Sequence, residues 1–112
     1  MSAPHLLVDC QDGVLTLTIN RPEARNALSL ALLDDLAGAL ADHANDPSLS
    51  VAVITATGDR CFAAGGDLKE LDAVRSEDDA TAMSRRGRAA LDAVRNFPVP
   101  VIGALNGLAL GG

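Results

Sequence analysis

The chain has 112 residues, of which 48% are hydrophobic and only 2% aromatic, and its formal net charge is −6. This length allows at most one domain, with a modest core built from Leu, Val, Ile and Ala side chains. The acidic balance argues against a general nucleic-acid-binding protein, which needs a basic face. No apolar run approaches the length of a membrane span.

The first predicted element is a β-hairpin. Residues 5–9 and 14–20 have the composition of two strands, and Gln11-Asp12-Gly13 between them contains the Asp-Gly pair that favours a hairpin turn. Polar and apolar residues alternate in the second strand, which places one face in the core. The residues expected on that face are Leu15, Leu17 and Ile19. Residues 22–28 then form a loop.

A helix follows over residues 30–44, with Ser29 as its N-cap. Its expected apolar stripe consists of Leu30, Leu33, Leu36, Ala37, Leu40 and Ala44. Residues 51–57 (VAVITAT) form a nearly continuous apolar run, which is typical of a strand buried on both faces.

The next long helix is expected from about residue 76 to 96. Its thin apolar stripe comprises Ala80, Met83, Gly87, Ala90, Leu91 and Val94. Its arginines could form a phosphate clamp, but a solvated face balanced by Asp78, Asp79 and Asp92 is the favoured interpretation. Residues 99–105 complete a third buried-type strand. Strands that alternate with helices predict an α/β layer with mostly parallel pairing, and the sheet is expected to be incomplete.

Two strand-to-helix turns contain the small residues that a backbone binding site needs. In CFAAGGDLKEL, Gly65-Gly66 precede a helix expected to begin at Asp67, and VIGALNGLALGG ends in a similar turn at Gly111-Gly112. Unpaired N–H groups at two such turns could converge on one oxygen atom and form an oxyanion hole. Either turn taken alone is more often a matter of tight packing.

Three blocks of the sequence together resemble one family, the crotonase or enoyl-CoA hydratase/isomerase superfamily. They are LTINRPEARNALS, VAVITATGDRCFAAGGDLKEL and PVIGALNGLALGG, in the family's order and spacing. The resemblance implies an α/β fold, a partial crotonase-like ββα spiral whose incomplete sheet has helices on its faces. It implies that residues 1–112 are the N-terminal part of a single domain whose C-terminal half is absent from this sequence.

The resemblance also assigns roles to residues. The backbone N–H groups of Gly66 and Gly112 would form the oxyanion hole. The expected CoA-binding residues are Ala24, Arg25, Ala64, Gly66, Asp67, Leu68 and Lys69. No separate cofactor is expected, because CoA is part of the substrate, and neither Asp67 nor Glu70 is given a general-base role. A metal site is not expected either, because the spacing of the two cysteines fits no zinc pattern.

The implied function is that of an acyl-CoA thioester-binding enzyme of the hydratase or isomerase type, which stabilises a thioester enolate. Because the family's catalytic carboxylates lie beyond the last residue of this sequence, a second hypothesis stays open: a catalytically inactive fragment or partner-dependent piece. A dinucleotide-binding half-domain is disfavoured, because GLALGG does not match G-x-G-x-x-G. The expected partner is an acyl-CoA, not nucleic acid or membrane. The family implies a homotrimer or hexamer, and the cysteine usage predicts a cytoplasmic protein.

Overall fold

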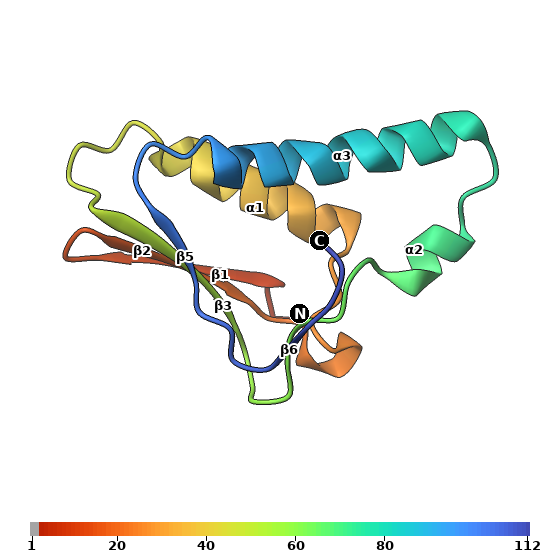
Figure 1. Ribbon diagram of the computed structural model, residues 1–112, viewed down its shortest axis with the longest axis horizontal. Coiled ribbons are helices and arrows are strands. Elements are labelled where there is room, and N and C mark those ends of the chain that lie inside the picture. Colours follow the sequence, from red (N-terminus) through yellow and green to blue (C-terminus); the bar gives the residue numbers. More distant parts are fainter. Residues whose placement is uncertain (1–2) are drawn as a thin grey trace.

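Four strands form the main sheet in the order β1-β2-β3-β5 in the computed structural model, which describes residues 3–112 (Figure 1). β1 is antiparallel to β2, whereas β2, β3 and β5 run parallel to one another. Their bounds are Leu6–Gln11 (β1), Val14–Ile19 (β2), Val51–Ala56 (β3) and Val101–Gly103 (β5). A second sheet consists of two short parallel strands, β4 (Cys61–Ala63) and β6 (Leu108–Ala109).

The predicted hairpin is confirmed, with a tighter turn than expected. Asp12 and Gly13 both have positive φ, 52° and 80°, as a type I′ turn requires. This two-residue turn allows β1 to pair with β2 as far as Gln11 and Val14, so the first strand does not end at residue 9. The core face of β2 is as predicted, since Leu15, Leu17 and Ile19 are buried.

Helix α1 (Leu30–His43) begins where predicted, and Ser29 Oγ accepts a hydrogen bond from Leu32 N at 3.1 Å. Its buried residues are Leu32, Leu36, Ala39 and Leu40. The predicted stripe omitted Leu32 and Ala39 and gave too narrow an apolar surface. The reason is that α1 packs against both the sheet and helix α3 (Figure 1).

Helix α3 (Glu77–Arg95) is capped by Ser76 and buries only Ala90. Leu91, which the predicted stripe included, is 52% exposed. Arg86 forms an exposed ion pair with Asp34 of α1, with Nη2 and Oδ2 2.6 Å apart. The acidic partner of this arginine therefore lies on the neighbouring helix, and not among the residues of α3 that the sequence suggested.

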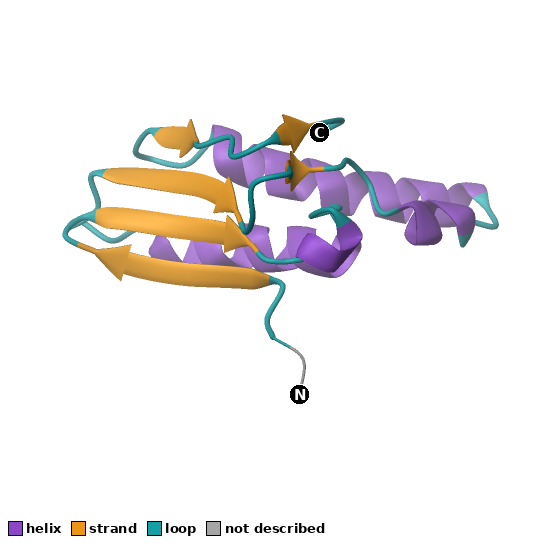
Figure 2. Cartoon of the chain, turned by 90° about the horizontal axis from the view of Figure 1, so that it is seen from below, coloured by secondary structure: helices purple, strands orange, loops and turns teal. Residues whose placement is uncertain are grey.

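Both long helices lie on the same face of the main sheet (Figure 2). In β3 the burial alternates, with Ala52, Ile54 and Ala56 buried and the intervening residues half-buried. The prediction that this strand is buried on both faces is therefore wrong within residues 3–112. Three short elements connect the layers: the 3₁₀ helix η1 (Pro22–Ala24), strand β4 and helix α2 (Leu68–Asp72).

Candidate active site

The two glycine-containing turns lie side by side because the strands that precede them are paired. Leu110 N donates a hydrogen bond to Ala63 O at 2.9 Å, immediately after the β4–β6 pairing. Gly65 and Gly111 have positive φ, 89° and 71°, and a Cβ added to Gly111 would lie 3.2 Å from Gly65 Cα. The backbones of the two turns thus lie so close at Gly65 and Gly111 that a side chain at position 111 would be crowded.

The register between β4 and β6 depends on a close backbone approach at Gly107. A Cβ at this position would overlap the Arg60 carbonyl group and lie 2.9 Å from Cys61 N. The adjacent Leu108 N donates to Arg60 O at 3.0 Å, and Asn106 Nδ2 donates to Gly58 O at 2.8 Å. These contacts fix where the chain enters β6 and therefore where Gly111 and Gly112 lie.

The loop before α1 has an unusual backbone that is held by a buried side chain. Arg25 and Asn26 are consecutive left-handed residues, with φ of 55° and 56°, a conformation that costs a non-glycine residue about 1 kcal/mol or more. Asn26 is 1% exposed, and its Nδ2 donates to Cys61 O at 2.8 Å and to Thr57 O at 3.1 Å. Its Oδ1 accepts from Arg21 N at 2.9 Å. The side chain therefore ties this loop to the segment that leads into β4.

A cleft of about 430 Å³ lies between the loop before α1, the turn after β4 and strand β6. Its size is within the range of small-molecule sites. All seven residues expected to bind CoA line it, namely Ala24, Arg25, Ala64, Gly66, Asp67, Leu68 and Lys69. A neighbouring cleft of about 400 Å³ is lined by residues of η1 and of the turn before β4, but neither glycine turn lines it.

Gly66 presents a free backbone donor at this cleft. It is exposed, and no group within residues 3–112 accepts a hydrogen bond from its N–H. The residues on either side of it are bonded to Leu28: Leu28 N donates to Gly65 O at 2.8 Å, and Asp67 N donates to Leu28 O at 3.3 Å. Gly112 is also exposed, but it is not among the residues that line the cleft.

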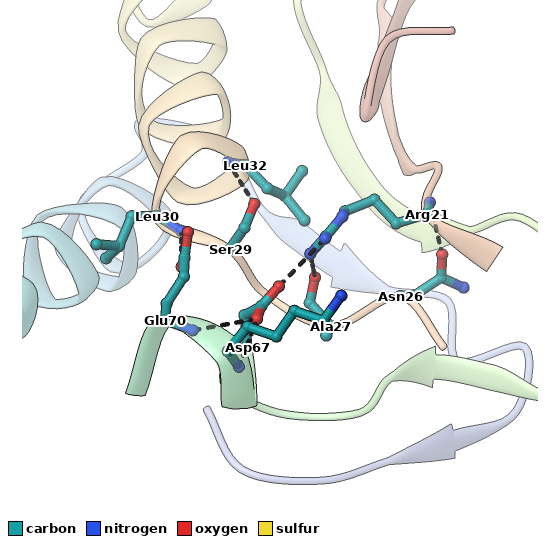
Figure 3. Close-up of polar contacts among 9 residues, drawn as sticks. Arg21, Asn26, Ala27, Ser29, Leu30, Leu32, Asp67 and Glu70 are labelled. Atoms are coloured by element: carbon teal, nitrogen blue, oxygen red, sulfur yellow. Dashed lines mark hydrogen bonds and ion pairs between the residues drawn. The ribbon is translucent and has the colours of Figure 1, made fainter. Parts of the chain in front are cut away.

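Asp67 has two structural roles, as a helix cap and as an ion-pair partner (Figure 3). Its Oδ1 accepts hydrogen bonds from Lys69 N and Glu70 N and caps α2, while its Oδ2 pairs with Arg21 Nη2 at 3.2 Å. Burial opposes ionisation of this carboxyl group, but the hydrogen bonds from Arg21 and from the two backbone N–H groups outweigh it. They hold the pKa of Asp67 below its ordinary value.

Glu70, one turn along, holds the start of helix α1. Its Oε1 accepts a hydrogen bond from Leu30 N at 2.7 Å, which satisfies one of the free N–H groups of that helix (Figure 3). This contact gives Glu70 a structural role. Asp67 and Glu70 thus both link the turn after β4 to the loop before α1.

The family model described as enoyl-CoA hydratase/isomerase matches residues 9–112 of this chain. The chain belongs to the enoyl-CoA hydratase/isomerase family. It is 48% identical over 108 residues to the 2,3-dehydroadipyl-CoA hydratase of Escherichia coli K12, a match that covers 96% of this chain and 40% of that protein. It is 37% identical over 112 residues to a probable enoyl-CoA hydratase of Bacillus subtilis, covering all of this chain and 42% of that protein.

Solved members of the family have the same arrangement of elements. An enoyl-CoA hydratase/carnithine racemase from Magnetospirillum magneticum superposes with a TM-score of 0.91 at 35% identity, over 98% of this chain and 42% of the other. An enoyl-CoA hydratase from Bacillus anthracis gives a TM-score of 0.88 at 33% identity, over 95% and 41%. The chain therefore has the crotonase fold, and it spans about two fifths of the length of the relatives it matches.

Within this member of the family, sequence reasoning found the residues of the cleft but missed those that hold it. Arg21 and Asn26 were not singled out, because their partners lie 46 and 35 residues away and no local pattern marks them. Cys10 and Cys61 form no disulfide with each other. In the part of the chain that the structure describes, no cluster of three or more acidic, histidine or cysteine side chains could hold a metal ion. No helix of residues 3–112 is long and apolar enough to cross a membrane.

Proposed function

We propose that the protein binds an acyl-CoA thioester in the cleft beside Gly66 and polarises the thioester carbonyl with the backbone N–H groups of Gly66 and Gly112. The observation that carries the proposal is the pairing of β4 with β6. It brings the two glycine turns together next to a cleft lined by every residue expected to contact CoA. The E. coli and B. subtilis relatives, both named as hydratases of CoA thioesters, support the same substrate class.

The chemistry follows from the charge that develops on the thioester oxygen. When water adds to the β-carbon of an enoyl thioester, the electron pair of the double bond moves onto that oxygen and an enolate forms. The attacking water gives up a proton, and delivery of a proton to the α-carbon completes hydration. A double-bond shift involves no water: removal of a proton from the γ-carbon gives a dienolate on the same oxygen, and return of a proton to the α-carbon completes the shift. Two backbone N–H groups about 2.7–3.1 Å from the oxygen stabilise the enolate, and the loss of one such donor typically costs about 10²–10³ in rate.

The proposal covers the protein's partners as well. CoA arrives as part of the substrate, so the reaction uses no separate cofactor, and neither nucleic acid nor a membrane takes part. We propose a homotrimer or hexamer as the working assembly, by analogy with the family, and a cytoplasmic location, which the two free cysteines favour.

The test is a pair of substitutions at Gly66 in the full-length protein. Gly66→Pro removes the donor N–H, whereas Gly66→Ala keeps it and adds a Cβ that would lie 3.6 Å from Leu71 Cδ1, an ordinary contact. We expect kcat/KM for crotonyl-CoA or 2,3-dehydroadipyl-CoA to fall by about 10²–10³ in the proline variant and to be largely kept in the alanine variant.

Equal turnover by the two variants would contradict the proposed role of the Gly66 N–H in the oxyanion hole. A wild-type protein that binds the thioester but does not turn it over would instead support the non-catalytic hypothesis.

A further inference from the structure

The direction of the Gly66 N–H group is fixed by a hydrogen bond to its neighbour. The Gly65–Gly66 peptide is trans, so its carbonyl oxygen and its N–H point in opposite directions. Leu28 N donates to Gly65 O at 2.8 Å. The N–H of the same peptide must therefore point away from Leu28, and any rotation of this peptide plane that turned the donor elsewhere would break that bond.

A single guanidinium group ties together the two segments that form this contact (Figure 3). Arg21 Nη1 donates to Ala27 O at 2.8 Å, and Ala27 directly precedes Leu28. Arg21 Nη2 donates to Asp67 Oδ2 at 3.2 Å, and Asp67 directly follows Gly66. Arg21 thus connects the residue before Leu28 to the residue after Gly66.

The Arg21–Asp67 ion pair is largely buried and can therefore hold the two segments together. The Arg21 and Asp67 side chains are 14% and 13% exposed, so solvent and salt screen their attraction much less than at the surface. The lowered pKa of Asp67 agrees with a carboxylate that stays ionised against Arg21. A second ion pair, Arg86 with Asp34, has side chains that are 43% and 52% exposed and joins the two long helices. Pairs of that kind contribute little.

We propose that Arg21 is a positioning residue that acts through Asp67 to aim the Gly66 N–H at the substrate carbonyl. This inference rests on the proposed oxyanion role of Gly66. A salt bridge that has no contact with the reacting atoms would then control how strongly the thioester is polarised. Loss of this salt bridge leaves the Gly66 N–H present but misdirected, so the transition state is destabilised more than the ground state.

Two conservative substitutions separate the Arg21–Asp67 ion pair from the other roles of Arg21 and Asp67. Asp67→Asn keeps an oxygen that can cap α2, since asparagine is as good an N-cap as aspartate, but it removes the charge that faces Arg21. Arg21→Lys keeps the positive charge but lacks the planar fork that reaches Ala27 O and Asp67 together. Asp34→Asn is the matched control, because it removes the other ion pair.

The experiment compares these full-length variants by kinetics and by spectroscopy. Bound cinnamoyl-CoA, a conjugated thioester, absorbs at a longer wavelength the more its carbonyl is polarised. The shift of its absorption maximum therefore reports how well the Gly66 N–H is directed at the carbonyl, and no turnover is needed. We expect Asp67→Asn and Arg21→Lys to lose much of this shift and to lower kcat by about 10²-fold, the scale of a misplacement of about 1 Å, with little change in KM. Hydrogen exchange at the Leu28 amide should accelerate in both variants, and Asp34→Asn should match the wild type in every measurement.

The outcomes distinguish this inference from the function on which it rests. The double variant Arg21→Lys/Asp67→Asn should lose no more kcat and no more spectral shift than either single variant, because both substitutions remove the same ion pair. Effects that add, or that fall on KM alone, would mean that the two side chains contact CoA independently, which would overturn the positioning role. A normal shift and normal kcat in Asp67→Asn would also overturn it, whether or not the melting temperature fell. No shift in the wild-type protein would instead refute the oxyanion hole, and this inference with it.

Discussion

The close approach at Gly107 predicts a large effect from a single added methyl group. In Gly107→Ala the Cβ would overlap the Arg60 carbonyl, a backbone group that cannot rotate away as a side chain could. Overpacking of this kind costs about 1–3 kcal/mol. Moving β6 away from β4 would also break the hydrogen bond from Leu108 N to Arg60 O, worth about 0.5–1.5 kcal/mol net. We therefore expect the free energy of unfolding to fall by about 1.5–4.5 kcal/mol.

Urea denaturation of the full-length protein measures this loss, with Gly103→Ala as the matched control. Gly103 ends β5 in the same stretch of chain, but a Cβ there would meet nothing within 4 Å. The control should stay within about 0.5 kcal/mol of the wild type. Equal stability of the two variants would show that the β4–β6 contact yields without cost, and the argument that Gly107 sets the register would fail.

Two further predictions concern the carboxylate of Asp67 and the N-caps of the two long helices. Because the pKa of Asp67 is lowered by folding, its ionised form adds stability that is complete well above the unfolded pKa of about 3.9 and is lost as the pH falls through the lower folded value. The stability difference between the wild type and Asp67→Asn should therefore be constant above about pH 5 and shrink below about pH 4; a constant difference down to pH 2 would contradict this. Ser29→Ala should destabilise the protein by about 1–2 kcal/mol, because this cap is buried. Ser76→Ala should destabilise it by only about 0.5–1 kcal/mol, because this cap is exposed and water can replace it. Thermal unfolding measures both losses, and equal destabilisation by the two variants would contradict this reasoning.

The sequence indicated those parts of the fold that depend on local patterns. The turn at Asp12-Gly13, the alternation in β2 and the cap at Ser29 each rest on residues within a few positions of one another, and each was predicted correctly. The apolar surface of α1 was predicted too narrow, because its width depends on α3 packing against it. The burial of β3 was overestimated for a similar reason: an apolar run does not say on which face the helices lie.

The candidate site likewise has a part that local sequence patterns indicate and a part that depends on the fold. The small-residue turns could be found, because glycine pairs after apolar strands are visible in the sequence. The other residues of the cleft came from the resemblance to the family. Strand β6 was missed, because two residues have no periodicity and become a strand only when β4 pairs with them. No local pattern marks Arg21, which precedes a proline, and only the fold brings Asp67 to it.

The pairing of β4 with β6 also bears on the order in which the molecule assembles. The hairpin closes between Gln11 and Val14, neighbours along the chain, whereas the amide of Asn106 reaches Cys61 across 45 residues. Closing such a long loop costs conformational entropy before any contact compensates for it, and non-local strand pairing is slow for that reason. The cleft is thus expected to form late in folding, after the β1–β2 hairpin. It is also expected to open first under mild denaturation, so that binding competence is lost before the sheet melts.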